Sequence, residues 1–376
     1  MSKLATLFRN SVEFQPLDDE SKEDNKKEGV YTLKPEIIKK LNYPQWAPVW
    51  ETKQELAFRA QVPFHHTDRG YFGDPSFDSL FKGTGATKKE LTPKLGLEIK
   101  GLQLSKLSDR QKDDLALLVE KKGVTIFRNQ DFKDLPFEDI KKWGRYFGPL
   151  HVHNTPGAPL GQPEFHLVLG VRDKTGRIPS YYITWHSDVS YEVHPPAITA
   201  LDGLKAVHSS RRQIQGGKAA GGIARKPIVE SIHPVVRYHP VLKKKGLFVS
   251  GTAAHGGFTT KILGLKDEES DALLSFLLNH INGLLDAHVR GSWDDRTVVV
   301  WDNRRLVHSA TSDIEPDSVR AAFRVTTVGE RPVSSEKEFN EWTPEKEQEL
   351  IDHTPEYLDY TPREFYGKFY EPRERA

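Results

Sequence analysis

Apolar residues recur along the chain at two spacings, and each spacing predicts one kind of element. Between Leu107 and Gly123, between Phe137 and Gly148 and between Glu268 and Ile281 they fall three or four positions apart, which is the period of an amphipathic helix. Short alternating or continuous apolar runs predict strands instead. Those runs occupy residues 95–99, 124–127, 197–201, 232–241, 247–249, 297–301 and 321–325. Many short strands beside a few helices indicate a mainly β fold with flanking helices.

The first of these helices carries local signals for both of its ends. Ser108 stands at the expected N-cap, and Gln111 can complete a capping box, with Leu107 before it as a hydrophobic staple. Gly123 follows the last apolar position and can adopt the left-handed conformation that ends many helices. We therefore expect a helix that starts after Ser108 and stops at Gly123, followed by a buried strand.

The same patterns divide the chain into four regions. Residues 1–30 form a mixed-charge run without apolar anchors and are expected to be a disordered tail. Residues 31–90 hold many aromatic residues but no period, so we expect an irregular arm that lies on the domain, with a loose tail as the alternative. Residues 91–333 are expected to form the main domain, in which the Gly- and Pro-rich stretch 154–180 is a long loop. Residues 334–376 are expected to be a helical or irregular C-terminal extension.

The composition narrows the classes of function. The 54 basic and 53 acidic residues leave a formal net charge of +1, so no attraction to nucleic acid or to a membrane surface follows. The chain has no cysteine, which excludes disulfides, thiolate metal ligands and cysteine nucleophiles. No signal-peptide core and no apolar run of ~20 residues is present, so we expect a cytoplasmic protein without a membrane span. Whether identical chains associate into a homo-oligomer is left open.

The strongest candidates for metal-binding side chains lie in residues 185–191, which read Trp-His-Ser-Asp-Val-Ser-Tyr. On a strand, positions i and i+2 point to the same face, so His186 and Asp188 are expected to lie side by side. A third ligand is needed, and the best candidate is His308, which follows the apolar run at 298–301. Two histidines and one carboxylate on one face of a metal, with open positions opposite them, form the arrangement of non-haem Fe(II) oxygenases.

Other histidines give weaker signals. His151 and His153 alternate on one predicted strand face, but without a carboxylate nearby they make a poor metal site, and one of them is expected to line the pocket. His233 and His239 are expected to be packed, hydrogen-bonded histidines. A zinc hydrolase that uses the same three ligands is a weak alternative, because no glutamate stands near either histidine as in His-Glu-x-x-His.

Two arginines downstream of His308 bear on the co-substrate. A 2-oxo acid would take two of the three open positions of the metal, and O₂ would take the last. The far carboxylate of a 2-oxo dicarboxylate needs a cation, and the planar fork of arginine matches a carboxylate. Arg320 and Arg324 are the candidates, and plain surface charge at the start of a strand is the other interpretation.

Five motifs occur together in a fixed order. They are Thr-Pro-Lys-Leu-Gly-Leu-Glu-Ile at 92–99, Gly-Val-Thr-Ile-Phe-Arg-Asn-Gln at 123–130, Phe-Gly-Pro-Leu-His-Val-His at 147–153, Trp-His-Ser-Asp at 185–188, and Trp-Asp-Asn-Arg at 301–304 followed by His308. With these motifs the chain resembles the taurine dioxygenase family of Fe(II)/2-oxoglutarate-dependent oxygenases, and within it the fungal sulfonate dioxygenases. The resemblance covers residues 90–333.

The resemblance implies a double-stranded β-helix, or jelly-roll, core and assigns roles to particular residues. It implies three iron ligands: His186, Asp188 and His308. Arg320 matches the family arginine that binds 2-oxoglutarate, if one inserted residue is allowed after the distal histidine. Arg324 matches the arginine that holds the sulfonate of the substrate, and His153 matches a histidine that contacts the substrate.

The resemblance also implies a reaction on a small anionic substrate. 2-Oxoglutarate and O₂ are consumed, 2-oxoglutarate becomes succinate and CO₂, and the carbon that bears the sulfonate is hydroxylated. The hydroxylated product then breaks into sulfite and an aldehyde. Sulfate esters, aryloxyalkanoates and xanthine are alternative substrates within the same family. A non-catalytic family member with a structural or binding role is the alternative from another class.

Three departures from the family pattern are visible. After Asp202 the chain runs directly into residues 203–210, where the family has a Gly-Gly-Asp-Thr turn and a helix, so a strand–helix segment is expected to be missing. Its loss would leave backbone donors unpaired, which is the physical basis of the non-catalytic alternative. Ile183 and Pro156 stand in place of the asparagine and tyrosine of taurine-specific members, which argues against taurine itself. Residues 250–257 are expected to be an insertion beside the site.

Overall fold

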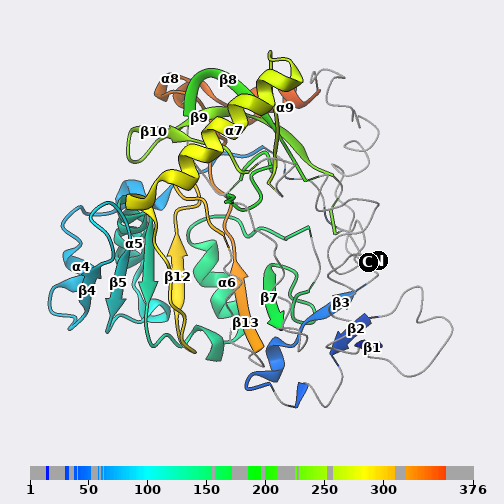
Figure 1. Cartoon of the computed structure of the whole chain (residues 1–376). Helices are drawn as coiled ribbons and strands as arrows, with labels where there is room; N and C mark the ends of the chain where they lie inside the picture. The colour runs from blue at the N-terminus through cyan, green and yellow to red at the C-terminus, as the bar shows by residue number, and fades with distance from the viewer. Residues whose placement is uncertain are drawn as a thin grey trace.

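Figure 1 shows the fold in a computed structural model of the chain. The structure describes residues 14–16, 30–33, 38–39, 41–51, 58, 61, 63–154, 157–171, 185–195, 200–210, 225–226, 228–251, 257–309 and 319–352. Within these residues β-sheets form the centre and helices pack outside them, so the predicted mainly β class with flanking helices is confirmed. Among the described helices, none is long and apolar enough to cross a membrane.

Two four-stranded sheets make up most of the described β structure. The first has the order β12-β6-β5-β4, with β5 and β6 parallel and the other neighbours antiparallel. Its strands are Thr87–Glu90 (β4), Leu97–Lys100 (β5), Val124–Phe127 (β6) and Val298–Trp301 (β12). The second sheet is antiparallel and has the order β10-β9-β8-β11. Its strands are Ala200–Ser209 (β8), Glu230–His239 (β9), Lys244–Leu247 (β10) and Thr259–Ile262 (β11).

Two helices share a core with the first sheet. They are α5, Asp109–Lys122, and α6, Phe137–Arg145. The predicted capping box is present: the hydroxyl of Ser108 accepts from the Gln111 N–H at 3.3 Å, and Gln111 Oε1 accepts from the Ser108 N–H at 3.0 Å. Gly123 ends α5 with a φ of 76°, as predicted, in a region that glycine enters without steric cost. Leu115, Leu118 and Phe127 are fully buried between helix and sheet.

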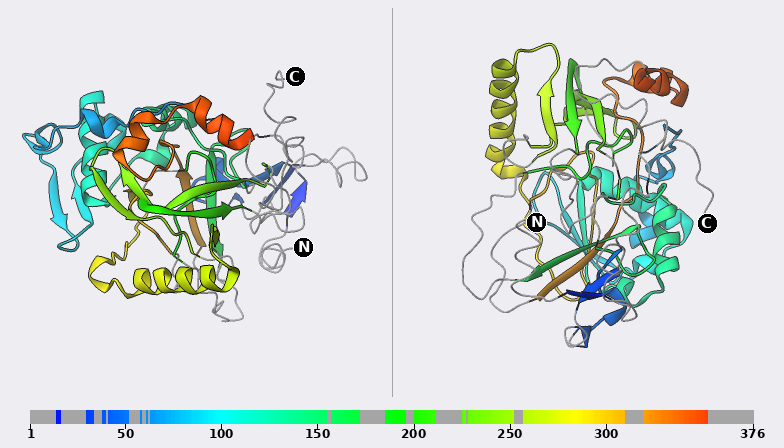
Figure 2. Two further views of the ribbon diagram at one scale, coloured as in Figure 1. Left: turned by 90° about the horizontal axis from the view of Figure 1, so that it is seen from above. Right: turned by 90° about the vertical axis from the view of Figure 1, so that its right-hand side faces the viewer.

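The second sheet carries helices on both sides. Figure 2 shows α7, Asp267–Gly283, on one face and α8, Glu336–Glu341, with α9, Pro344–Asp352, on the other. Leu274, Leu277 and Leu278 of α7 pack into the core of this sheet, as the predicted helix at 268–281 requires. The C-terminal extension is helical in its described part, and residues 353–376 lie outside the described residues.

Strand β10 starts earlier than the sequence predicts. The apolar run at 247–249 predicts a strand there, but β10 begins at Lys244, directly after Lys243 turns the chain with a φ of 52°. The lysines of β10 face solvent, so hydrophobic pattern carries no signal for this edge strand. Phe248 and Val249, which follow β10, are buried in the fold.

A two-stranded antiparallel sheet pairs β7, Phe165–Val171, with β13, Val319–Val325. Strand β7 lies inside the stretch 154–180, which the sequence predicts to be a loop, and that prediction is wrong for these seven residues. Flanking Gly and Pro residues hide the short alternation in Phe-His-Leu-Val-Leu. The strand forms because β13, far away in the chain, supplies its hydrogen-bonding partner.

The first 90 residues contain short elements that the sequence does not predict, and the first strand, Phe14–Pro16, lies in the stretch 1–30 that was expected to be a disordered tail. They are the strands Phe14–Pro16 (β1), Val30–Leu33 (β2) and Val49–Glu51 (β3), which form one sheet, the 3-10 helices Pro44–Trp46 (η1) and Arg69–Phe72 (η3), and the helix Asp78–Phe81 (α4). Elements of three or four residues are too short to show a period. The indole of Trp46 stacks on Phe323 of β13 with 4.0 Å between ring centroids, so this part of the arm lies on the domain. Three further 3-10 turns are Leu104–Lys106 (η4), Phe132–Asp134 (η5) and Leu285–Ala287 (η8).

Strand β8 runs through Asp202, where the sequence predicts a missing segment. Its pairing with β9 shifts register between Leu201 and Lys205, so an irregularity lies at that point. A bulge of this kind takes up extra residues without ending the strand.

Candidate metal centre

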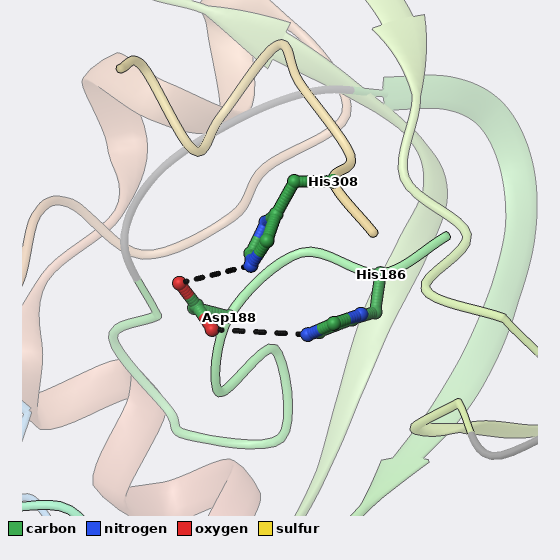
Figure 3. Close-up of side chains that lie close together, drawn as sticks. All are labelled: His186, Asp188 and His308. Carbon is green, nitrogen blue, oxygen red and sulfur yellow. Dashed lines mark ion pairs between the residues drawn. The ribbon is translucent and has the colours of Figure 1, made fainter. Parts of the chain in front are cut away.

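The three predicted metal ligands lie together. The Nε2 atom of His186 is 3.9 Å from Asp188 Oδ1, and the Nε2 atom of His308 is 3.6 Å from Asp188 Oδ2 (Figure 3). One ligand atom from each of the three residues lies within 4.8 Å of the other two. Asp188 is 5% exposed, whereas the two histidines are partly open, so the carboxylate forms the buried base of the group.

The backbone brings His186 and His308 side by side. The His186 N–H donates to the His308 carbonyl at 3.0 Å, and the His308 N–H donates to the His186 carbonyl at 2.9 Å. Among the described residues, this isolated antiparallel bridge is the sheet pairing at this point. The prediction that Asp188 lies on a strand is wrong: it begins a turn, and Val189 after it has a φ of 43°. Such a conformation is costly for a β-branched residue and needs support from its surroundings.

The charges around Asp188 suit a ligand for a divalent cation. Burial works to raise the pKa of Asp188, but the charge of Arg324 and its hydrogen bond hold that pKa well below its usual range. Burial lowers the pKa of His308 to about 4, although the charge of Asp188 opposes the change. At neutral pH the carboxylate is therefore ionised and the His308 imidazole is neutral, which are the forms that bind a metal.

Arg324 reaches the same carboxylate from β13. Its Nη1 atom lies 2.5 Å from Asp188 Oδ1, and its side chain is mostly buried. Its Nε atom is buried and has no hydrogen-bond partner among the described residues. An unpaired buried donor is costly, so this position favours an acceptor such as an anion. Arg320 lies on the same strand, where it pairs with Gly170 of β7, and its side chain lies outside the described residues.

His153 lies beside a histidine that the sequence did not single out. Its ring stacks on that of His166 with 4.0 Å between centroids, and His166 is the β7 residue paired directly with Arg324 of β13. Burial, followed by the charge of Arg324, lowers the pKa of His166 to about 3. Burial also holds the pKa of His153 well below its usual range, with contributions from His166 and Arg324. Both imidazoles are therefore neutral near the guanidinium.

His151, the other histidine of its predicted pair, serves a buried ionic network instead. Its Nε2 atom is 2.8 Å from Glu192 Oε1, and the Lys226 ammonium donates to the same oxygen at 2.8 Å. All three side chains are buried. The sequence expected one histidine of the pair to line the pocket, and the structure leaves His153 as the one beside Arg324 and His166. His233 and His239 are packed and buried, as predicted.

A second group of possible ligands is already neutralised. His66, Asp68 and Glu330 also bring three ligand atoms within 4.8 Å of one another. The guanidinium of Arg304, however, donates to Asp68, to Glu330 Oε2 at 3.3 Å, and to Glu120. A fixed cation between these carboxylates repels a metal ion, so this group is a buried salt-bridge network rather than a metal site.

The chain is similar to several known proteins. The model of the family described as taurine catabolism dioxygenase TauD, TfdA family matches residues 87–201 and 199–326. The chain is 38% identical to the alpha-ketoglutarate-dependent sulfonate dioxygenase of Saccharomyces cerevisiae, over 83% of this chain and 84% of the relative. It is 28% identical to an alkylsulfatase of Acinetobacter baylyi, over 64% of this chain and 84% of that protein.

A solved structure adds support for the fold. It comes from Burkholderia xenovorans and is named for an alpha-ketoglutarate-dependent taurine dioxygenase, an assignment that its name marks as provisional. The TM-score is 0.51 at 26% identity, over 66% of this chain and 95% of that one.

The alignments also bear on the predicted missing segment. The family model matches in two pieces that meet at residues 199–201, directly before Asp202. The alignment with the yeast relative is 354 positions long, but it includes only 83% of the 376 residues of this chain. The aligned part of this chain is therefore shorter than the alignment, so the relative has residues that have no counterpart here. The loss of a strand–helix segment after Asp202 stays a prediction that both observations favour. With a model match over more than half of its length and these relatives, the chain belongs to the TauD, TfdA family of dioxygenases.

Proposed function

We propose that the protein is an Fe(II)- and 2-oxoglutarate-dependent dioxygenase that hydroxylates a small alkyl sulfonate. The observation that carries the proposal is the convergence of His186, Asp188 and His308, with Arg324 directly beside them. The identity to the yeast alpha-ketoglutarate-dependent sulfonate dioxygenase supports the choice of co-substrate and substrate class. Within the proposal, the double-stranded β-helix is the fold that surrounds the site.

The donor set fits Fe(II). Two imidazoles and one carboxylate on one side, without a thiolate, are the ligands that non-haem iron uses in oxygenases. Bound iron, together with 2-oxoglutarate and O₂, would supply the oxidation that hydroxylates a C–H bond. The protein contributes the placement: His186 and His308 are locked by their backbone bridge, and Asp188 stays ionised beside them. Arg320 is the proposed partner of the far carboxylate of 2-oxoglutarate.

The substrate end of the site is built for an anion. Arg324 offers a buried Nε–H that has no partner among the described residues, and the neutral imidazoles of His153 and His166 lie next to it. A sulfonate has three oxygens to accept from such donors, and a guanidinium is well suited to hold it. In the balanced reaction, R–CH₂–SO₃⁻, 2-oxoglutarate and O₂ give R–CHO, sulfite, succinate and CO₂.

Sulfate esters are the second candidate. The alkylsulfatase among the relatives favours them, and a sulfate ester presents the same –SO₃⁻ oxygens to Arg324 as a sulfonate does. The two classes differ in their product, because hydroxylation next to a sulfonate releases sulfite and hydroxylation next to a sulfate ester releases sulfate. No described residue favours an aryloxyalkanoate or xanthine.

The test begins with anaerobic addition of Fe(II) and then 2-oxoglutarate to the purified protein. A weak visible charge-transfer band is expected, because a 2-oxo acid chelated to iron at such a centre absorbs there. Oxygen is then admitted with an alkyl sulfonate or with the alkyl sulfate of the same chain length. Succinate and sulfite should form with the sulfonate. Sulfate formation alone selects the ester, and iron binding without band or succinate favours the non-catalytic alternative.

A further inference from the structure

In the part of the chain that the structure describes, the candidate metal ligands belong to no full strand. His186 makes a single bridge to His308, and the residues after it turn away from any strand. Buried backbone N–H and C=O groups must nevertheless be paired. The question is which groups replace a neighbouring strand along residues 186–188, because that pairing fixes where the two ligands point.

Side chains take over the pairing one residue after the bridge. The hydroxyl of Ser250 accepts from the Ser187 N–H at 3.0 Å and donates to the Ser187 carbonyl at 3.1 Å. A single hydroxyl therefore satisfies both backbone groups of the residue between the ligands. Ser250 is fully buried and is itself fixed, since its N–H donates to Thr259 Oγ1 at 2.9 Å and its carbonyl accepts from Phe258 at 2.7 Å.

The next residue is held in the same two-way manner by an amide. Asn303 Oδ1 accepts from the Asp188 N–H at 2.9 Å, and Asn303 Nδ2 donates to the Asp188 carbonyl at 3.2 Å. A carboxamide has the donor and the acceptor of a peptide group, so Asn303 imitates a neighbouring strand for one residue. Its side chain is buried, and it stands five positions before His308.

Three successive residues are thus held by reciprocal pairs of hydrogen bonds from separate groups. His186 is held by the backbone of His308, Ser187 by Ser250 and Asp188 by Asn303. Each pair fixes the position of a peptide unit and the direction of the side chain that leaves it. Val189, whose φ is strained, directly follows the pair between Asp188 and Asn303. Loss of that pair of hydrogen bonds would let the backbone at Val189 relax.

We propose that Ser250 and Asn303 are positioning residues, which set His186 and Asp188 in ligating geometry before a metal arrives. The inference rests on the metal site of the proposed function, and it assigns roles to two residues that touch neither metal nor substrate. Outer residues that orient metal ligands typically change metal affinity 10–100-fold when they are replaced. Loss of the hydrogen bonds from either Ser250 or Asn303 should therefore weaken metal binding without removing a ligand.

Co(II) alone is the probe, because its visible absorption reports both affinity and geometry. Anaerobic titration of the full chain should give a tight site in the wild type. Ser250→Ala and Asn303→Ala should each weaken Co(II) binding by about 10–100-fold and alter the absorption band. Ser250→Thr keeps the hydroxyl and should restore most of the affinity.

Ser210→Ala is the matched control. Ser210 is also fully buried, and its hydroxyl accepts from the Val229 N–H at 2.7 Å rather than from the backbone of residues 186–188. The control should lower the thermal midpoint of the metal-free protein to a similar extent as Ser250→Ala while leaving Co(II) affinity unchanged.

The outcomes separate the two proposals. If the wild type binds no Co(II), the metal site of the proposed function fails. If the wild type binds tightly and Ser250→Ala and Asn303→Ala bind equally well, the positioning role is overturned and the metal site stands. If Ser210→Ala loses as much affinity as Ser250→Ala, general destabilisation explains the effect, and the positioning role is again overturned.

Discussion

Among the described residues, two groups each present three ligand-type side chains, and they differ in how an arginine lies beside them. In the first, Asp188 lies between two imidazoles, one of its oxygens faces Arg324, and the other faces the neutral ring of His308. In the second, the carboxylates of Asp68 and Glu330 both lie on the guanidinium of Arg304. Converging ligand atoms alone do not define a metal site. What distinguishes the two groups is how the arginine is placed: Arg304 contacts both carboxylates of the second group, whereas Arg324 contacts one oxygen of Asp188 and leaves the other facing His308.

The largest expected effect is the loss of metal binding from the first group. Asp188→Ala or His186→Ala removes one of the three ligands, and the remaining two cannot hold a divalent ion tightly in competition with water. We expect no bound iron or cobalt in either variant, measured by elemental analysis after dialysis. Asp68→Asn, which alters the second group, should bind metal like the wild type. Metal retained by Asp188→Ala, or lost from Asp68→Asn, would reverse the comparison.

The second group should dominate stability instead. Arg304→Met leaves Asp68, Asp302 and Glu330 without their shared cation in a buried place. Breaking a buried ion pair in this way lowers the free energy of unfolding by about 3–5 kcal/mol, which urea denaturation measures. Lys82→Met removes an exposed ion pair with Asp78 and should lower the free energy of unfolding by no more than about 1 kcal/mol. Equal losses in the two variants would contradict the assignment of Arg304 as the structural cation.

Arg324 differs from Arg304 in that it has a donor left for an anion. Its Nη1 contacts Asp188, and its Nε has no hydrogen-bond partner among the described residues. Arg324→Ala should raise KM for the sulfonate by roughly 30-fold or more, which corresponds to about 2 kcal/mol for a lost charged partner. KM for 2-oxoglutarate should change much less, and steady-state kinetics at saturating iron measures both. Equal changes in the two constants would exchange the roles proposed for Arg320 and Arg324. Co(II) affinity of the variant is the control for damage to Asp188.

The smallest expected effect concerns a buried histidine outside both groups. Burial, followed by the charge of Arg331, lowers the pKa of His208 to about 3. The unfolded chain takes up the proton below about pH 6.5 and the folded chain does not, so stability falls as the pH drops from 6.5 toward 3. His208→Phe should flatten this slope by at most about 1.4 kcal/mol per pH unit. Urea denaturation at pH 7 and pH 5 tests it, and an unchanged slope would show that His208 is protonated in the fold.

Local signals in the sequence predicted the helical parts well. The capping box of Ser108 and Gln111 and the stop at Gly123 involve neighbours within one turn, so nothing distant can override them easily. The candidate ligands His186, Asp188 and His308 were predicted from residue type and order, and the structure brings all three together. Strand β7 was missed because its stability comes from β13, and His166 was missed with it.

The sequence by itself determined the element types with strong local patterns, the chemistry of the three ligand side chains and the resemblance to a family. It could not determine how residues 186–188 are held, because their partners Ser250, Asn303 and His308 lie far along the chain. The tertiary structure alone also decided that Asp68 and Glu330 share the guanidinium of Arg304, whereas Asp188 contacts Arg324 through one oxygen. The physical reason is the same in both cases: hydrogen bonds and buried charges depend on distance in space, and an i, i+2 spacing fixes that distance only where a regular strand exists.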